Sequence, residues 1–320
     1  MGRPALASQS PGTVRKMKSD SILILGTGAL ATLFAARFAK AGISVTMLGT
    51  WAEALAAINE KGIQVEGEGK KYRVHATADP ADCKGMLFAL VLVKAWQTEH
   101  AAYQLSECLS DDGIALTLQN GLGNDMELAS SLGLARVSQG VTTIGATLNA
   151  PGEVCQGGVG PVSIAPQPRL VLPEKLLRRA GFEVNEVDNI ESLIWGKLVV
   201  SSALNPLTAL LRVKNGEILE NTQAKALMGK LARETASVGK KMGVILPFTS
   251  PENAVEEVAR RTSENVSSML QDILRGAPTE IDAINGAVVR LADKNAVRVP
   301  INRTVWSLVK AIPVRGNIKK

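Results

Sequence analysis

Apolar residues occur in short continuous runs through the first half of the chain and at helical spacing through most of the second half. A short aliphatic run is typical of a strand that is buried on both faces, as in a parallel sheet. Amphipathic patterns predict helices at residues 29–41 and 52–61, and residues 63–74 have the pattern of a hairpin. Strands that alternate with helices predict a doubly wound α/β sheet. The predicted buried strands are residues 21–25, 43–48, 86–93 and 114–118.

The residue composition and the hydrophobic periodicity of the chain change twice after this region. Residues 137–164, rich in Thr, Gly and Val, predict antiparallel strands, and a helix (174–180) and a last strand (182–187) follow. From about residue 190 the pattern is almost entirely helical. The predicted helices are residues 193–211, 223–242, 251–274 and 279–295.

The fold class is therefore predicted to be α/β, with an N-terminal Rossmann-type doubly wound sheet followed by an all-helical C-terminal domain. We place the dinucleotide-binding domain at residues 21–189 and the helical substrate and catalytic domain at residues 190–320. Residues 1–20 are rich in Ser, Pro, Gly and basic residues and contain no apolar stretch. They are predicted to form a disordered tail outside the fold.

Composition argues against several classes of protein. Hydrophobic residues make up 46% and charged residues 21% of the chain, which is typical of a globular protein. No apolar run approaches the roughly 20 residues that cross a bilayer, so no membrane partner is expected. The formal net charge of +6 is spread along the chain without a basic stripe and interleaved aromatic residues, so no nucleic acid partner is expected. A modest positive charge also suits anionic small molecules.

The cysteines and histidines narrow the chemistry further. Cys83, Cys108 and Cys155 have no paired spacing and are interpreted as reduced thiols of a cytoplasmic protein. His75 and His100 are the only histidines and lack a flanking ligand pattern, which argues against a zinc site or a Ser-His-Asp triad. No metal site is predicted. Any proton transfer then falls to Lys, Glu, Asp or Tyr.

A glycine-rich turn links the first predicted strand to the first predicted helix. Gly26 permits a tight turn, Gly28 lets the backbone approach a pyrophosphate, and a small residue at 31 lets helix and strand pack closely. The helix N-terminus would present free N–H groups to the diphosphate. A structural turn is the alternative, but a second strand follows at the spacing of one βαβ unit, which favours dinucleotide binding. The motif is Gly26-Thr27-Gly28-Ala29-Leu30-Ala31.

Thr50, at the end of the second strand, bears on the choice of cofactor. An NAD site usually has an acidic residue here and an NADP site often has an arginine, and this chain has neither. Without a carboxylate the main repulsion against a 2′-phosphate is removed, and Thr50 could donate a hydrogen bond to it. This favours NADPH over NADH.

Two polar residues follow buried strands, at the edge where ligands bind in parallel sheets. Lys94 follows the strand that ends near residue 93, and Asn120 follows the strand that ends near residue 118. Each has a plainer interpretation. Lys94 could be a solvated lysine at a strand end, and Asn120-Gly121 could be simple turn chemistry.

Lys197, Ser201 and Asn205 are four residues apart in an otherwise apolar helix. They therefore project from one helix face. A lysine that lines an apolar pocket suits a general acid, because desolvation lowers its pKa towards the working pH. The alternative is a lysine at the exposed start of a buried helix.

Six motifs occur in order along the chain. They are Gly-Thr-Gly-Ala-Leu-Ala, Val-Lys-Ala, Gln-Asn-Gly-Leu-Gly, Trp-Gly-Lys-Leu, Asn-Pro-Leu-Thr-Ala and Ser-Ser-Met-Leu-Gln-Asp, and Thr279-Glu280-Ile281-Asp282 follows the last. With these motifs the chain resembles a known family, the ketopantoate reductases (2-dehydropantoate 2-reductases), over about residues 21–311. This resemblance implies NADPH-dependent reduction of ketopantoate to pantoate, a precursor of pantothenate and coenzyme A.

The resemblance also implies roles for individual residues. Lys197 matches the catalytic lysine that protonates the carbonyl oxygen, and Glu280 matches a glutamate near the nicotinamide and the substrate. The positions that match cofactor contacts are Lys94, Asn120 and Ala146. The positions that match substrate contacts are Lys197, Ser201, Asn205, Asn215, Asn265 and Ser268.

The chain departs from the family at two of these positions. Ser201 replaces an asparagine, and its shorter side chain has less reach towards a substrate. Thr50 stands where the family usually has an arginine, which weakens the inference of NADP preference. Glu280, predicted to open a helix, would also be favoured there by the helix dipole alone. Asn215-Gly216 suits a turn, and Asn265 and Ser268 suit a polar helix face.

Three other functions stay open at this point. A related reductase for another small 2-oxo acid would account for Ser201 and Thr50. A non-catalytic NADP-binding module would need neither Lys197 nor Glu280. A dehydrogenase of 3-hydroxy acids or sugar acids fits the Asn-Pro-Leu-Thr helix poorly. The oligomeric state, including a homodimer, also stays open.

Overall fold

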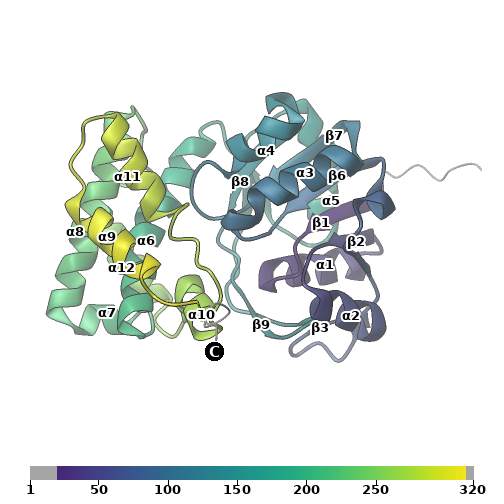
Figure 1. The fold of residues 1–320 in the computed structure, drawn as a ribbon, viewed down its shortest axis with the longest axis horizontal. Coiled ribbons are helices and arrows are strands. Elements are labelled where there is room, and N and C mark those ends of the chain that lie inside the picture. Colours follow the sequence, from purple (N-terminus) through teal and green to yellow (C-terminus); the bar gives the residue numbers. More distant parts are fainter. Residues whose placement is uncertain (1–19, 315–320) are drawn as a thin grey trace, which may run out of the picture.

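The computed structural model describes residues 20–314 of the chain. The predicted disordered tail therefore lies almost wholly outside the described residues. Figure 1 shows an α/β part, which contains the N-terminal half, beside a part made only of helices. This arrangement confirms the predicted fold class.

The first part is built around an eight-stranded sheet in the order β12-β11-β8-β7-β6-β1-β2-β5. The six strands from β5 to β8 are parallel, whereas β11 pairs antiparallel with β8 and parallel with β12. Of these six, β1, β2, β6 and β7 are predicted as parallel strands; β5 is not predicted, and β8 is predicted to be antiparallel. These strands are β1 (Ser21–Leu25), β2 (Ser44–Leu48), β5 (His75–Thr77), β6 (Met86–Val91), β7 (Leu109–Thr117), β8 (Val137–Thr142), β11 (Val162–Ile164) and β12 (Val184–Glu186).

A second, four-stranded sheet has the order β4-β3-β10-β9. Its strands are β3 (Ile63–Val65), β4 (Lys71–Tyr72), β9 (Ala146–Ala150) and β10 (Glu153–Gln156). The predicted hairpin at 63–74 is therefore present as β3 and β4. The predicted antiparallel region at 137–164 is divided, because β9 and β10 join this sheet while β8 continues the parallel one.

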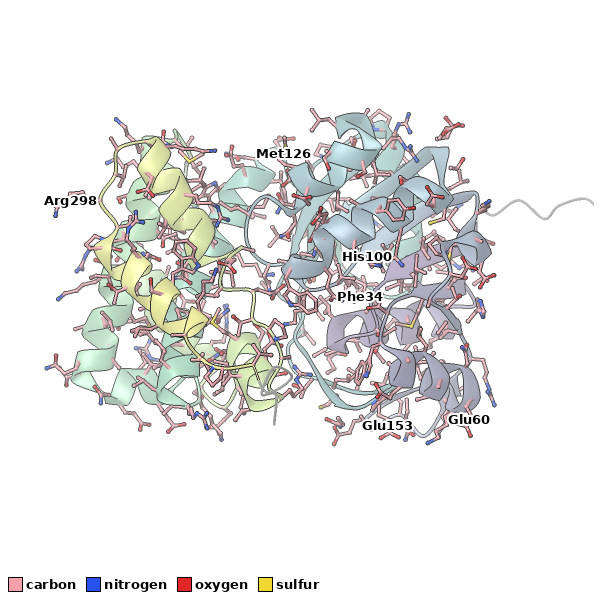
Figure 2. The ribbon with its side chains drawn as sticks, viewed as in Figure 1. Phe34, Glu60, His100, Met126, Glu153 and Arg298 are labelled. Atoms are coloured by element: carbon pink, nitrogen blue, oxygen red, sulfur yellow. The ribbon has the colours of Figure 1, made fainter. Side chains whose placement is uncertain are left out.

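Strand β1 shows why the large sheet needs cover on both faces. Its side chains alternate, with Ile22 and Ile24 in one buried cluster and Leu23 and Leu25 in another. Phe34 (labelled in Figure 2), on α1, belongs to the first cluster, and α3 and α4 supply side chains to the second. The helices of this part are α1 (Ala29–Lys40), α2 (Ala52–Lys61), α3 (Thr98–Cys108), α4 (Asn124–Leu132) and α5 (Val171–Arg179).

Helix α6 is the centre of the helical part and packs against α8, α9, α10 and α12. It is long and apolar enough to cross a membrane, but 67% of its most apolar window is buried inside the molecule, so it is a core helix. The helices are α6 (Ile190–Leu211), α7 (Glu217–Glu220), α8 (Thr222–Lys241), α9 (Pro251–Arg261), α10 (Ser268–Leu274), α11 (Asn285–Lys294) and α12 (Pro300–Lys310).

Two predicted helices differ from the structure. The single helix at 251–274 is wrong, because the chain leaves the helix between α9 and α10. There the carbonyl oxygens of Ser263 and Asn265 accept hydrogen bonds from the backbone N–H groups of Gly216 and Asn215, and Ser267 caps the new helix. The prediction that Glu280 opens a helix is also wrong, because α11 begins at Asn285.

Candidate active site

A cleft of about 1090 Å³ is lined by residues of both parts of the molecule. On the sheet side it is lined by the glycine turn and by residues that follow β2, β6, β7 and β8. On the helical side it is lined by α6, α10 and the segments before α10 and α11. His100, which is on α3 and is labelled in Figure 2, also lines it. The cleft thus opens at the carboxyl edge of the parallel strands, where ligands bind in such sheets.

The glycine turn begins the sheet side of this cleft. Gly26 has a φ of +114°, and its N–H donates to the carbonyl oxygen of Leu48 at 2.8 Å. A Cβ at Gly26 would lie 3.1 Å from the carbonyl oxygen of Leu92, whereas a Cβ at Gly28 would meet nothing within 4 Å. Gly28 is the N-cap of α1, and no side-chain hydrogen bond caps this helix. The first N–H groups of α1 therefore remain available to an anion in the cleft.

The remaining residues of the motif divide between the cleft and the core. Thr27, Ala29 and Leu30 line the cleft. Ala31 does not, because it is fully buried within α1 and packs in the core cluster on that face of the sheet. One side of the motif thus faces the cleft, and the other side packs closely in the core.

Thr50 and Trp51 line the cleft just beyond β2. The Trp51 indole N–H donates to the carboxylate of Glu53, in the first turn of α2. Glu53 is an acidic group near this end of the cleft that sequence reasoning did not consider.

Lys94 makes an ion pair that crosses between the two parts of the molecule. Its Nζ lies 2.7 Å from Oδ2 of Asp272, on α10, and 3.6 Å from Oε2 of Glu280. Burial of Lys94 disfavours its ammonium, but Glu280 and Asp272 outweigh this effect and raise the pKa of Lys94 above its usual value. Lys94 is therefore a charged anchor between the strand end and α10, and its side chain is still one-third exposed in the cleft.

Glu280 is held from three directions in the turn that precedes α11. Its Oε1 accepts from the backbone N–H of Ala95 at 3.2 Å, and its Oε2 accepts from Nδ2 of Asn120 at 3.2 Å. Lys94 is the third partner. The carboxylate is 6% exposed, so it is an almost buried charge, held by an amide, an ammonium and a backbone N–H.

The Asn120-Gly121 turn is shaped by the same segment. Gly121 has a φ of +87°, and a Cβ there would lie 2.3 Å from the carbonyl oxygen of Ala283. The same oxygen accepts from the N–H of Leu122 at 2.9 Å. Asn120 therefore does more than form a turn, because its amide and the following backbone hold the segment that carries Glu280.

Lys197 projects from α6 towards the end of β8. Its Nζ donates to the carbonyl oxygen of Thr142 at 2.8 Å, and the residue lines the cleft. Burial lowers the pKa of Lys197 to about 8, and the negative charge of Glu280 acts in the opposite direction. The ammonium thus lies within the cleft instead of facing bulk solvent.

Ser201 lines a separate small cavity beside Lys197 instead of the main cleft. Its Oγ donates to the carbonyl oxygen of Lys197 at 2.9 Å, within its own helix. The side chain is 9% exposed. In this conformation its hydroxyl proton is used by α6, and its predicted contact with substrate stays a prediction.

The other residues predicted to bind substrate or cofactor do line the cleft. Asn205 comes from α6, and Asn215 from the loop after it, where its Nδ2 donates to Oγ1 of Thr262 at 2.9 Å. Oδ1 of Asn215 is buried and has no hydrogen-bond partner within residues 20–314. The remaining members are Asn265, Ser268 and, on the sheet side, Ala146 at the start of β9.

Sequence reasoning did not name Asp272 or the carbonyl group of Thr142 as parts of the site. Asp272 is 2% exposed, and the only signal in the sequence was its place at the end of the Ser-Ser-Met-Leu-Gln-Asp motif. The carbonyl group of Thr142 leaves no signal in a sequence, because every residue has one. Among residues 20–314 no group of three or more His, Cys, Asp or Glu side chains could hold a metal ion.

Comparison with known proteins places these features in a family. Residues 22–169 match the family model described as ketopantoate reductase PanE/ApbA, and residues 189–313 match the model of the C-terminal region of the same family. A 2-dehydropantoate 2-reductase of Archaeoglobus fulgidus is 37% identical over 92% of this chain and 99% of its own length. One from Pyrococcus horikoshii is 34% identical over 91% of this chain and 96% of its own length.

Solved structures of oxidoreductases align with this chain over almost its whole length. A PanE/ApbA family ketopantoate reductase from Ralstonia eutropha aligns with a TM-score of 0.85 at 29% identity, covering 91% of this chain and 98% of that one. A D-mandelate dehydrogenase in a ternary structure with NADH and anilino(oxo)acetate aligns with a TM-score of 0.86 at 26% identity, covering 93% and 100%.

The fold and the cleft define a nicotinamide-dependent oxidoreductase with a Rossmann-type part and a helical part. Within that class, the chain belongs to the ketopantoate reductase family.

Proposed function

We propose that this protein reduces 2-dehydropantoate to pantoate with NADPH. The observation that carries the proposal is the position of Lys197, whose ammonium lies in the cleft with a pKa lowered to about 8 by burial. A group with that pKa is protonated near neutral pH and still gives up its proton readily, as a general acid must.

The residues of the cleft fit a dinucleotide. The first turn of α1 has no acidic residue and no side-chain cap, and a Cβ at Gly28 would meet nothing within 4 Å. A pyrophosphate would be held by these N–H groups. Lys94, Asn120 and Ala146 line the same cleft as the glycine turn and Lys197, and they are proposed to contact the nicotinamide half.

The 2′-phosphate of NADPH is proposed to lie at Thr50. Residues 48–51 contain no carboxylate, so they offer no direct repulsion to a phosphate, and the Thr50 hydroxyl can donate to it. Glu53 is nearby but accepts a hydrogen bond from the Trp51 indole. NADH remains the alternative cofactor, and the D-mandelate dehydrogenase neighbour is described with NADH.

When bound, the reduced nicotinamide supplies a hydride to the carbonyl carbon at C2 of the substrate. As negative charge develops on the carbonyl oxygen, the ammonium of Lys197 stabilises it and transfers its proton to that oxygen. The carbonyl group of Thr142 orients Nζ without neutralising it, because it is an uncharged acceptor. Lys197, which is neutral after this transfer, then takes a proton from solvent.

Glu280 is proposed to assist in two ways. Its negative charge opposes the effect of burial on Lys197 and so keeps more of the lysine protonated. Its contacts with Asn120 and the backbone of Ala95 fix the helical part against the strand ends that would contact the nicotinamide.

The carboxylate and hydroxyl groups of the substrate are proposed to bind the polar residues on the helical wall of the cleft. Asn205, Asn215, Asn265 and Ser268 offer amide and hydroxyl donors there. The buried, unpartnered Oδ1 of Asn215 suits a substrate hydroxyl donor. Ser201 is proposed to take part only if its hydroxyl leaves the carbonyl group of Lys197.

A related reductase of another small 2-oxo acid is the second candidate. Ser201 replaces the asparagine expected from the family, and a D-mandelate dehydrogenase aligns over 93% of this chain. The test is steady-state oxidation of NADPH, and separately of NADH, with ketopantoate, benzoylformate and other 2-oxo acids. The proposal requires the highest kcat/KM with ketopantoate and NADPH. A higher value with another 2-oxo acid would assign the chain to the second candidate.

A further inference from the structure

Helix α6 lacks one backbone hydrogen bond near its middle. Pro206 lies inside this helix and has no N–H group. The carbonyl group that would accept the missing hydrogen bond is that of Ser202, four residues earlier. Ser202 is 0% exposed, so its carbonyl oxygen would be costly to leave without a donor.

The side chain of Asn285 supplies that donor from another helix. Asn285 is the first residue of α11 and is 0% exposed. Its Nδ2 donates to the carbonyl oxygen of Ser202 at 2.9 Å and to Oδ1 of Asn302 at 2.9 Å. The amide thus uses both of its N–H groups at the point where Pro206 has removed one.

Neighbouring contacts fix which way this amide points. Asn302 donates from Nδ2 to Oε2 of Glu234 at 2.9 Å, so its Oδ1 faces Asn285. A flipped Asn285 amide would place its own oxygen against two acceptor oxygens. In the observed orientation Oδ1 of Asn285 is buried without a partner in the described part of the chain. The donors of Asn285, and not its acceptor, therefore account for its place here.

The hydrogen bond between Asn285 and the carbonyl group of Ser202 connects the two segments that carry the proposed catalytic groups. Ser202 lies between Lys197 and Asn205 on α6, and Asn285 lies five residues after Glu280. The segment before Asn285 is also held to the sheet part, because the N–H of Leu122 donates to the carbonyl oxygen of Ala283 at 2.9 Å. Asn285 thus joins the Glu280 segment to α6 at the point where Pro206 removes a backbone hydrogen bond from α6.

We propose that Asn285 is a positioning residue whose amide replaces the missing N–H of Pro206 and so fixes Lys197 relative to Glu280. The inference rests on the proposed function of Lys197 and Glu280 and extends it to a residue that touches neither substrate nor cofactor. The proposal requires that the Asn285 amide be needed because Pro206 has no N–H group to donate to Ser202.

The test is a double-mutant cycle with Asn285→Leu and Pro206→Ala in the full-length protein. Leucine has the same branching and the same number of side-chain heavy atoms as asparagine, but it has no donor, so the carbonyl oxygen of Ser202 loses its partner. Its larger volume is common to both backgrounds and cancels in the cycle. We expect kcat/KM for the 2-oxo acid to fall about tenfold in the Pro206 background. In the Pro206→Ala background the introduced alanine provides a backbone N–H for Ser202, and the same substitution should cost a clearly smaller factor.

The loss of the hydrogen bond to Asn302 is common to both backgrounds and cancels in the cycle. An equal factor in both backgrounds, or no loss in either, would overturn the proposal. If Asn285→Leu alone does not fold, recovery of soluble protein in the double variant supports the proposal. A double variant that is no more soluble than the single one would overturn it.

Val289→Ala is a matched control, because Val289 is a buried side chain of α11 that has no part in the hydrogen bond to Ser202. Reduction needs the protonated Lys197, so kcat should fall at alkaline pH as this lysine loses its proton. Val289→Ala should lower stability but leave the pH of this fall unchanged, whereas Asn285→Leu should shift it. An equal shift in both variants would indicate a merely structural role.

Amide hydrogen exchange over residues 198–211 gives a reading that needs no substrate. Exchange should be faster in Asn285→Leu and return towards the wild-type rate in the double variant. If the wild-type protein reduces no 2-oxo acid, the proposed function fails while the exchange result still tests the hydrogen-bond replacement. If the protein is active but exchange is unchanged, the inference on Asn285 fails alone.

Discussion

The ammonium of Lys197 donates to the backbone carbonyl oxygen of Thr142 at 2.8 Å, and this contact joins α6 of the helical part to the end of β8 in the sheet part. The acceptor is neutral, so it orients the ammonium without compensating its charge. Burial then lowers the pKa of Lys197 to about 8, against the opposing charge of Glu280. A carboxylate in place of the carbonyl group would instead raise this pKa and make the proton harder to transfer.

Removal of the Lys197 ammonium is expected to abolish most of the turnover. Lys197→Ala should lower kcat by about 10²–10⁴-fold, because the developing oxyanion loses both its proton donor and its stabilising charge. NADPH affinity should change little, and fluorescence titration of the cofactor would measure it. Lys225→Ala is the control, because Lys225 lies on α8 and pairs with Glu256 outside the cleft. Undiminished kcat in Lys197→Ala would remove the lysine from the mechanism.

The pH dependence of turnover follows from the same group. Reduction needs the protonated lysine, so kcat for ketopantoate should be highest below pH 8 and fall as the pH rises through the pKa of about 8. Oxidation of pantoate needs the neutral lysine, so its rate should rise over the same range. Both directions can be followed through the nicotinamide absorbance. A reduction rate that stays flat from pH 7 to about pH 10, near the ordinary lysine pKa, would contradict the assignment.

Glu280→Gln should shift the fall in the reduction rate at alkaline pH towards lower pH. The charge of Glu280 raises the pKa of Lys197 against the effect of burial. Removal of that charge should therefore lower the pKa further, and the fall in the reduction rate should begin at a lower pH. Glutamine keeps one acceptor oxygen, which can accept from the N–H of Ala95 or from the amide of Asn120, whereas the carboxylate accepts from both. A fall that moves to higher pH would show that Glu280 does not act on Lys197 in this way.

Thr50, two residues after β2, is expected to set the preference between NADPH and NADH. Thr50→Arg would place a guanidinium at the edge of the cleft, where it can make a charge-assisted contact with a 2′-phosphate. We expect kcat/KM with NADPH to rise about tenfold and kcat/KM with NADH to change little. An equal change with both cofactors would place the 2′ position away from residue 50.

Features carried by neighbouring residues were predictable from the sequence. The strand, glycine turn and helix at residues 21–41 are contiguous, and the structure has each of them. The spacing of Lys197, Ser201 and Asn205 likewise predicts one helix face. Lys197 and Asn205 line the cleft, whereas Ser201 lines the small cavity beside Lys197. Periodicity is a local property, so it can be read without knowledge of distant contacts.

Features set by distant contacts were not predictable. Glu280 lies in a turn because Ala283 accepts from Leu122, which is more than 150 residues earlier in the chain. The break between α9 and α10 depends on carbonyl groups that pair with Asn215 and Gly216. The importance of Asp272 depends on Lys94, which comes from the other part of the molecule. In each case a tertiary partner outweighs the local helical pattern.

Two glycines of one turn allow this dependence on a distant contact to be measured. Gly121 and Gly123 have φ values of +87° and +90°, so an alanine at either position has similar backbone strain. A Cβ at Gly121 would lie 2.3 Å from the carbonyl oxygen of Ala283, whereas a Cβ at Gly123 would meet nothing within 4 Å. The difference between the two variants therefore isolates the contact with the Glu280 segment.

Gly123→Ala should lower the free energy of unfolding by about 1 kcal/mol, the cost of the left-handed backbone conformation. Gly121→Ala should cost about 3 kcal/mol, because the methyl group also displaces Ala283. That displacement should pull Glu280 away from the amide of Asn120, so kcat/KM should fall in Gly121→Ala and stay near wild type in Gly123→Ala. Urea denaturation and steady-state kinetics would measure both effects. Equal losses in the two variants would mean that the segment before α11 yields to the methyl group without cost, and Gly121 would then be explained by its backbone conformation alone.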